Sequence, residues 1–87
     1  MIKSWSDIAW NDYLWWQDND RKAVKKINRL IKEIERDPFD GIGKPEALTG
    51  NYSGLWSRRI DRANRIIYHV EGETLYLHSV KDHYGDH

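Results

Sequence analysis

The chain has 87 residues, 14 Lys or Arg against 14 Asp or Glu, and no cysteine. A chain this short forms one domain, so we expect residues 1–87 to fold as a single unit with 85–87 as a tail. The lack of cysteine excludes disulfides and thiolate metal sites. No apolar run approaches the roughly 18 residues of a membrane-spanning helix. We therefore expect a cytoplasmic protein with no membrane partner.

The net charge of zero hides two basic blocks. Residues 21–36 hold seven Lys or Arg against two Glu, and residues 58–65 hold four Arg against one Asp. Such blocks are typical of proteins that bind a polyanion such as nucleic acid, but the face of a solvated helix has the same composition. Composition alone leaves both interpretations open.

The first part of the chain predicts an edge strand and a helix. Residues 2–5 are apolar enough for a short strand, and Ser6 can cap the helix that follows. Trp5 and Trp10 stand at the positions of a hydrophobic staple around that cap. Apolar residues at helical spacing predict one buried stripe, made of Ala9, Trp10, Tyr13, Leu14 and Trp16.

A second helix is predicted directly afterwards. Asp20 can cap it, and Pro38 disfavours helical geometry at the residue before it, so the helix should end near Arg36. Its predicted buried positions are Val24, Ile27, Leu30, Ile31 and Ile34. The short connection implies that the two helices run antiparallel.

A loop rich in glycine and proline, residues 38–54, separates the helices from three predicted strands. These strands cover Leu55–Ile60, Arg65–Val70 and Thr74–Val80, and the short turns between them imply antiparallel pairing. The predicted fold class is α+β, with two antiparallel helices packed on a small, twisted, mainly antiparallel sheet.

Side chains alternate between the two faces of a sheet, which allows the register to be predicted. With Arg59 opposite Arg65, the face that covers the helices would carry Trp56, Ile60, Ile66, Tyr68, Val70, Thr74, Tyr76, His78 and Val80. The other face would carry Leu55, Ser57, Arg59, Arg65, Ile67, His69, Leu75, Leu77, Ser79, Lys81 and His83. One end of this second face is cationic.

The groups near that cationic end suit cleavage of an RNA phosphodiester. A base takes the proton of the 2′-hydroxyl, an acid protonates the leaving 5′-oxygen, and cations stabilise the charge that develops on the phosphate. His83, the arginines and the loop carboxylate Glu46 supply these group types. From spacing alone, a surface histidine and a solvated loop carboxylate remain the simpler interpretations.

A metal site is a weaker hypothesis. His83 and His87 are four residues apart, and Asp82 precedes the first of them. A catalytic zinc needs three protein ligands on firm structure, which a terminal histidine does not provide. We therefore expect no metal and no cofactor.

Five motifs taken together resemble a known family. They are DYLWW near the start, VKKINRLIKEIERDPFDGIGKPEAL, SGLWSRRI, RIIYHV and DHY at the end. In this order they resemble the YoeB toxins of the YoeB/YefM toxin–antitoxin family, in the RelE/ParE superfamily, from about Met1 to Tyr84. The resemblance implies a microbial-ribonuclease-like fold and an endonuclease that cuts messenger RNA in the ribosomal A site. It also implies a YefM-like antitoxin, the ribosome with its RNA, and a second copy in a homodimer as partners.

The resemblance also implies roles for three catalytic residues. Glu46 aligns with the proposed general base of the family and His83 with its proposed general acid. Arg65 aligns with the arginine that stabilises the transition state.

Four further positions concern substrate binding. Arg59 and Tyr84 match residues that orient phosphate and substrate. Three residues after the loop glutamate the family commonly has lysine, and here that position is Thr49. The cationic help of that lysine must then come from Lys44 or be missing, and in the second case the activity would be weaker or differently selective.

Two other functions are compatible with the resemblance. A member of the ParE branch keeps the scaffold but poisons a protein target, and that branch lacks the His83–Tyr84 pair present here. An RNA-binding or ribosome-binding domain that lost catalysis through Thr49 is the other alternative, because a fold alone does not determine a function.

Overall fold

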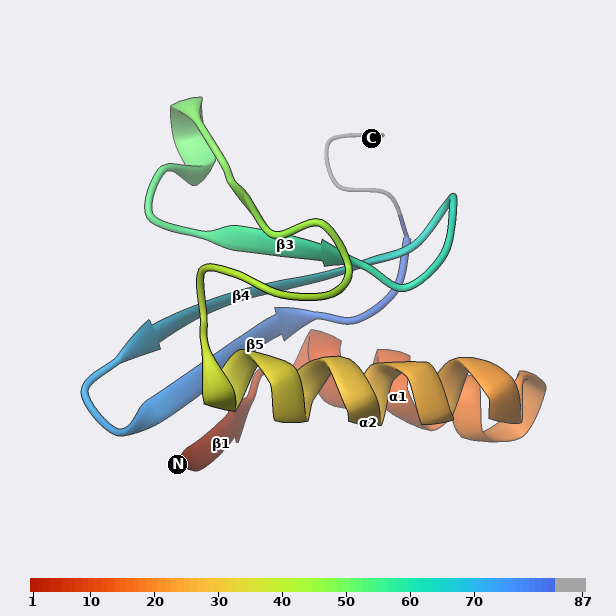
Figure 1. Cartoon of the computed structure of the whole chain (residues 1–87). Coiled ribbons are helices and arrows are strands. Elements are labelled where there is room, and N and C mark those ends of the chain that lie inside the picture. Colours follow the sequence, from red (N-terminus) through yellow and green to blue (C-terminus); the bar gives the residue numbers. More distant parts are fainter. Residues whose placement is uncertain (83–87) are drawn as a thin grey trace.

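The structure is a computed structural model, and it describes residues 1–82 (Figure 1). The predictions on His83, Tyr84 and residues 85–87 therefore lie outside the described residues. In chain order the elements are β1 (Ile2–Trp5), α1 (Asp7–Asn19), α2 (Arg21–Arg36), β2 (Glu46–Ala47), a short 3-10 helix η1 (Gly50–Tyr52), β3 (Trp56–Arg59), β4 (Arg65–Glu71) and β5 (Thr74–Ser79).

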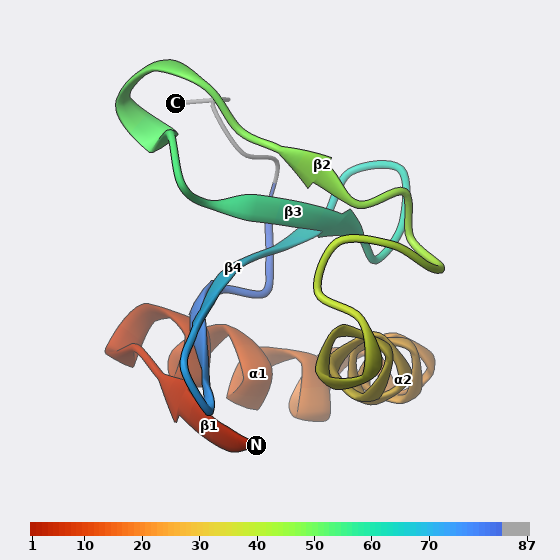
Figure 2. The same ribbon diagram turned by 60° about the vertical axis from the view of Figure 1, so that its left-hand side comes forward.

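The strands form one sheet in the order β1-β5-β4-β3-β2. β1 pairs parallel with β5, and the other pairs are antiparallel. Both helices lie on the same side of the sheet, and they run in opposite directions (Figures 1 and 2). The predicted α+β fold is confirmed, and so is the edge strand at residues 2–5. The two-residue strand β2 was not predicted.

Local capping begins both helices where the sequence predicts. The Ser6 hydroxyl accepts a hydrogen bond from the amide of Ala9 (3.0 Å), and the rings of Trp5 and Trp10 meet edge to face at 5.8 Å. The Asp20 carboxylate accepts from two amides in the first turn of α2. These contacts satisfy amides that have no partner inside the helix.

The core lies between the helices and the sheet. Its buried members are Ala9, Trp16, Ala23, Ile27, Leu30, Ile31, Ile34, Ile60, Ile66, Tyr68, Leu75, Leu77 and Val80. The predicted stripe of α1 is too wide, because Trp10 and Leu14 remain 46% and 40% exposed. A helix covered on one side buries only a narrow stripe. Trp16 holds that stripe to the sheet by donating from Nε1 to the carbonyl of Val80 (2.7 Å).

The first hairpin has the predicted register. Arg59 lies directly opposite Arg65, and Trp56 lies opposite Tyr68. Arg58 therefore points to the side of the helices, and Arg59 points away from them.

The second hairpin does not have the predicted register. Glu71 pairs with Thr74, so the turn has two residues instead of three, with Gly72 at φ +59°. A slip of one residue exchanges the two faces of a strand. Leu75 and Leu77 are consequently buried in the core, and the prediction that Thr74, Tyr76 and His78 cover the helices is wrong.

A β-bulge then reverses the exchange. The register shifts between Ile67 and Tyr68, so that Tyr68 pairs with Leu77 but Ile67 pairs with Ser79. The additional residue is His78. Beyond the bulge the predicted faces hold again, with Ser79 beside Ile67 and Val80 buried in the core.

Candidate active site

Glu46 reaches the sheet because β2 pairs with the outer edge of β3. It lies directly opposite Ser57 in the antiparallel register, and it is exposed. Just before β2, the carbonyl of Gly43 accepts from the amide of Arg59 at 2.6 Å. Gly43 has φ +83°, and a Cβ there would stand 2.8 Å from a methyl of Leu30. Only glycine fits where the loop passes this close to α2 and β3. The close contact aligns Glu46 with β3.

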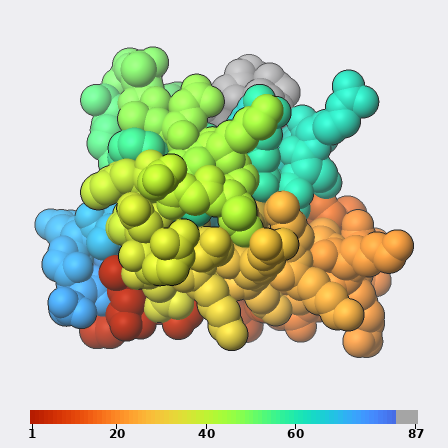
Figure 3. Space-filling model, viewed as in Figure 1, coloured from red at the N-terminus to blue at the C-terminus, as the bar shows by residue number. Residues whose placement is uncertain are grey.

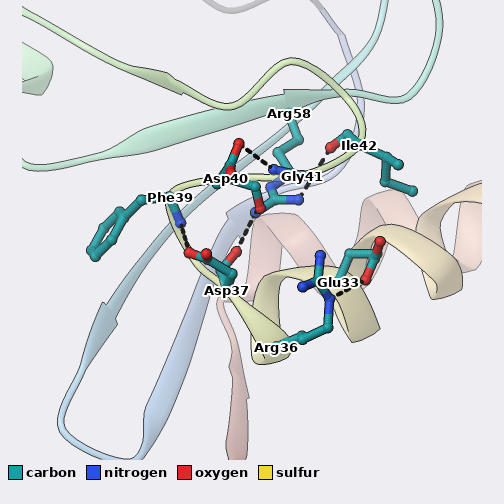
Figure 4. Close-up of polar contacts among 8 residues, drawn as sticks. All are labelled: Glu33, Arg36, Asp37, Phe39, Asp40, Gly41, Ile42 and Arg58. Atoms are coloured by element: carbon teal, nitrogen blue, oxygen red, sulfur yellow. Dashed lines mark hydrogen bonds and ion pairs between the residues drawn. The ribbon is translucent and has the colours of Figure 1, made fainter.

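Arg58 is the fully buried cation beneath this loop (Figure 4). Its guanidinium donates to the carbonyls of Asp37, Asp40 (2.9 Å) and Ile42 (3.1 Å), and its Nε donates to the hydroxyl of Tyr68 (3.1 Å). The same hydroxyl donates to a loop carbonyl at residue 38 (2.6 Å). One side chain thus holds the whole segment 37–42 against β3.

The environment of Arg58 is polar, and none of its hydrogen-bond partners among residues 1–82 is a carboxylate. Burial raises the pKa of the Tyr68 hydroxyl, which stays neutral and is able to accept from the guanidinium. The nearby Glu33 carboxylate binds Arg36 at 2.8 Å, and this hydrogen bond lowers the pKa of Glu33. The space-filling view shows the segment after α2 lying between that helix and the upper strands (Figure 3).

Arg59 and Arg65 form the cationic part of the site. They are direct cross-strand neighbours on the face away from the helices. Like charges placed opposite each other in a sheet are unfavourable. Within residues 1–82 neither arginine has an ion pair with a carboxylate, and Nη1 of Arg65 is buried without a hydrogen-bond partner. An anion such as a phosphate would reduce the repulsion between the two guanidinium groups, and it could accept hydrogen bonds from them.

The turn at residues 61–64 holds Arg65 beside the last described residues. The Asp61 carboxylate accepts from the amides of Ala63 and Asn64, both at 2.8 Å. The Asn64 side chain then accepts from the amide of Asp82 (2.6 Å), and the Asp82 carbonyl accepts from the amide of Arg65 (3.3 Å). Residue 82 is therefore fixed at the start of β4.

A groove of about 460 Å³ adjoins this region. It is lined by Ser6, Ile8, Asp12, Tyr52, Leu55, Ile67, His78, Ser79, Lys81 and Asp82. Among these residues, the Asp12 carboxylate accepts from the amide of Val80 (3.0 Å), and burial raises the pKa of this carboxyl. Lys81, predicted near the cationic end, lies over the ring of Trp15 at 4.5 Å and 3.5 Å from the Asp82 carboxylate.

A histidine pair stands on the same face, at β4 and β5. Nδ1 of His69 and Nε2 of His78 share a hydrogen bond of 2.8 Å, and the ring of Tyr76 stacks on His69 at 4.6 Å. Burial, and secondarily the neighbouring His69, lower the pKa of His78. The sequence placed these two rings on opposite faces, because the two-residue turn was not anticipated.

The structure brings three of the predicted site residues onto one face. Glu46, Arg59 and Arg65 come from β2, β3 and β4 respectively, and all three point away from the helices. Lys44 is exposed with φ +51°, two residues before Glu46, and Thr49 is exposed beside η1. Among residues 1–82, no three potential ligands gather at one point for a metal ion, and no helix has the length and apolarity to cross a bilayer.

The chain matches a family model described as YoeB-like toxin of bacterial type II toxin–antitoxin system, over residues 5–84. It is 52% identical to Toxin YoeB of Synechocystis, with 93% of this chain and 94% of that protein covered. It is 50% identical to Toxin YoeB of Escherichia coli, with 92% and 95% covered.

Solved structures agree with these matches. A YoeB/ParE toxin from Agrobacterium tumefaciens superimposes with a TM-score of 0.94 at 43% identity, covering 97% of this chain and all (100%) of that one. A YoeB dimer from Staphylococcus aureus gives 0.91 at 44% identity, covering 97% and 98%. The toxin in a heterotetrameric YoeB–YefM complex from the same species gives 0.89 at 44% identity, with the same coverage.

Proposed function

Because the chain belongs to the YoeB-like toxins of bacterial type II toxin–antitoxin systems, we propose that it is an endoribonuclease that cuts messenger RNA in the ribosomal A site. Translation would stop because the message is severed during decoding. A ribosomal target makes the cytoplasm the place of action. The proposal is supported chiefly by one arrangement on three adjacent strands of one sheet face: a carboxylate and two arginines that have no ion pair among residues 1–82.

The proposed chemistry is general acid–base catalysis. Glu46 takes the proton of the 2′-hydroxyl, whose oxygen attacks the adjacent phosphorus while the bond to the 5′-oxygen breaks. His83 donates a proton to that leaving oxygen. The products are a 2′,3′-cyclic phosphate and a 5′-hydroxyl end. Each proton transfer contributes about two to four orders of magnitude in rate.

Arg65 is the proposed transition-state residue, and Arg59 the proposed phosphate ligand. The guanidinium of Arg65 stands on a strand of the sheet, so it needs little reorganisation when charge develops on the phosphate, which is the arrangement that stabilises a transition state best. Lys44 and Tyr84 are proposed to bind the substrate backbone. Thr49 carries no charge, so Lys44 has to provide the cation that the family commonly places at that position.

Two protein partners are also proposed. A YefM-like antitoxin would neutralise this chain, as the Staphylococcus aureus complex contains YoeB with YefM. A homodimer is the proposed free form, in line with the YoeB dimer of that species. The exposed rings of Trp10 and Trp15 on α1 are apolar surface that a protein partner would cover.

The test is cleavage of a defined message by the purified chain on translating ribosomes, read by primer extension. Wild type should produce new 5′ ends at A-site codons, and Arg65→Ala and His83→Ala should lower the rate by at least about 100-fold. Arg62→Ala is the matched control, because Arg62 is exposed in the turn and has no polar partner among the described residues. It should cleave like wild type.

The outcomes separate the functions. Equal cleavage by wild type and both variants would show that Arg65 and His83 do not have the catalytic roles proposed for them. Growth arrest of cells that express wild type, together with an intact message in the ribosome assay, would favour the protein-poisoning alternative. Ribosome binding without cleavage would favour a binding domain.

A further inference from the structure

Ser57 is a buried polar residue that has no hydrogen-bond partner in the described part of the chain. It stands in the middle of β3, it is 1% exposed, and its Oγ makes no hydrogen bond to any residue that the structure describes. Within residues 1–82, only one other buried side-chain polar atom lacks a partner, and that is Nη1 of Arg65. Buried hydroxyls are nearly always paired, because leaving one unpaired is unfavourable. Both unpaired atoms thus lie on the same sheet face.

The register places Ser57 between the proposed base and the proposed cations. Glu46 is its direct neighbour on β2, and Ile67 is its direct neighbour on β4. Arg59 is two residues further along β3 on the same face, and Arg65 is diagonal to Ser57 across β4. Direct cross-strand neighbours have Cβ atoms about 5 Å apart, and diagonal ones lie within reach of a long side chain.

Glu46 needs an orienting contact. It is exposed, it belongs to a strand of only two residues, and it has no hydrogen bond or ion pair among the described residues. A carboxylate free to rotate is a poor base, since proton abstraction requires it within hydrogen-bond reach of the 2′-hydroxyl. A serine hydroxyl accepts and donates at the same time, so it can join a guanidinium to a carboxylate.

We propose that Ser57 is a positioning residue for cleavage, whose hydroxyl accepts from Nη1 of Arg65 and donates to the carboxylate of Glu46 when RNA is bound. The inference rests on the proposed function and adds a positioning residue to the same site. At 1% exposure Ser57 does not touch the RNA, and it acts by holding Glu46 toward the 2′-hydroxyl. Substrate closes the chain of hydrogen bonds that the free protein leaves open.

A positioning role and a structural role make opposite predictions for Ser57→Ala. A serine kept for stability would be hydrogen-bonded in the fold, and its loss would lower the melting temperature. Here the substitution removes an unpaired buried hydroxyl, so the melting temperature should stay equal or rise. Cleavage should nevertheless slow by roughly 10- to 100-fold, mostly in kcat with little change in KM, because the base is misplaced and RNA contacts are kept.

The experiment measures kcat, KM and the melting temperature of the full chain on translating ribosomes with a defined message. The variants are Ser57→Ala, Ser57→Thr, Glu46→Gln and the double variant Ser57→Ala/Glu46→Gln. Ser57→Thr keeps the hydroxyl and should restore most of the rate. Ser53→Ala is the matched control, an exposed serine that should cleave like wild type.

The double variant decides whether Ser57 acts through Glu46. In the Glu46→Gln background the loss of the hydroxyl should have no further effect. Wild-type rates in Ser57→Ala, a melting temperature that falls with the rate, or the same fold-loss in both backgrounds would each overturn the inference. Failure of the proposed function looks different: wild type itself would leave the message intact, and this inference would fall with it.

Discussion

At the residue scale, the adjacent arginines of β3 have opposite surroundings. Arg58 is fully buried under the loop 37–42, whereas Arg59 is exposed and lies opposite another arginine. Successive side chains along a strand point to opposite faces, which separates the two arginines. On the helix side, the carbonyls of the loop surround the guanidinium of Arg58. The first arginine therefore stabilises the fold, and the second is available to a ligand.

Replacing Arg58 by Met should be strongly destabilising. Three loop carbonyls and the Tyr68 hydroxyl lose their donor at once, and each buried polar group left unpaired costs about 1–3 kcal/mol. We expect the free energy of unfolding, measured in urea, to fall by about 3 kcal/mol or more. Arg62→Met, in the exposed turn, should stay within about 0.5 kcal/mol of wild type. Equal stability of the two variants would contradict this role of Arg58.

The predicted register implies the face of Arg58, because this residue stands between Trp56 and Ile60 on the same strand, but it does not predict the burial of the side chain. Strand alternation is local, so Arg59 opposite Arg65 could be predicted, and so could the caps at Ser6 and Asp20. The burial of an arginine depends on carbonyls some 20 residues earlier in the chain, within a loop that has no periodic pattern. The unpaired hydroxyl of Ser57 carries no sequence signal either, because it is recognised only by the absence of a partner.

At the element scale, the β4–β5 hairpin combines a tight turn with a bulge. The two-residue turn at Gly72 exchanges the faces of β5, and the bulge at Ile67 and Tyr68 exchanges them back. The predicted three-residue turn placed Leu75 and Leu77 on the wrong face, yet it placed Val80 correctly, because two register changes cancel. A bulge is an adjustment to tertiary packing, and the short apolar run of β5 is compatible with either register.

The histidine pair created by this hairpin should make stability depend on pH. Burial lowers the pKa of His78 below its ordinary value of 6.5. The unfolded chain then binds a proton more readily than the folded one, so stability decreases as the pH falls through about 6.5 and below. We expect a lower melting temperature at about pH 5.5 than at about pH 7.5, with a smaller drop in His78→Gln.

The comparison with the variant isolates this effect. The raised pKa of Asp12 acts with the opposite sign and in a lower pH range, from its ordinary 3.8 upward, and it is present in both proteins. His69, stacked on Tyr76 and 3.7 Å from Glu71, is also present in the variant with these two neighbours, and it loses only its hydrogen bond to the His78 ring. If the melting temperatures of wild type and His78→Gln fall by the same amount between the two pH values, the histidine pair does not cause the pH dependence.

At the scale of the whole molecule, positive charge lies on both sides of the sheet. The basic residues of α2 line the outer surface of a helix that covers one face, while Arg59 and Arg65 occupy the other face. One phosphate cannot contact both. If the chain acts on the ribosome as proposed, α2 would contact a second stretch of RNA. The basic block at residues 21–36 is compatible with such a contact, but the sequence alone does not show on which side of the sheet it lies.

The double variant Lys25→Ala/Lys32→Ala should weaken ribosome binding of the chain and make it less sensitive to salt. Both lysines are exposed on α2, and each lost phosphate contact lowers the slope of log affinity against log salt by about 0.7–0.9. Binding can be measured in the Arg65→Ala background, where the message stays intact. Lys3→Ala is the control, since that lysine pairs with Glu35 at 3.2 Å. An unchanged slope in the double variant would exclude α2 from RNA contact.

The parallel pairing of β1 with β5 bears on how the protein is made. Ile2 lies beside Thr74, so β1 is synthesised long before the strand with which it pairs. Contacts so distant in sequence slow folding, and they cannot form while β5 is still inside the ribosome. Ser57 and Arg65 likewise emerge well after Glu46. A nascent chain therefore has neither a closed sheet nor an assembled site until β5 has left the ribosome, so a proposed ribosome-directed toxin is unable to act on the ribosome before that point of its own synthesis.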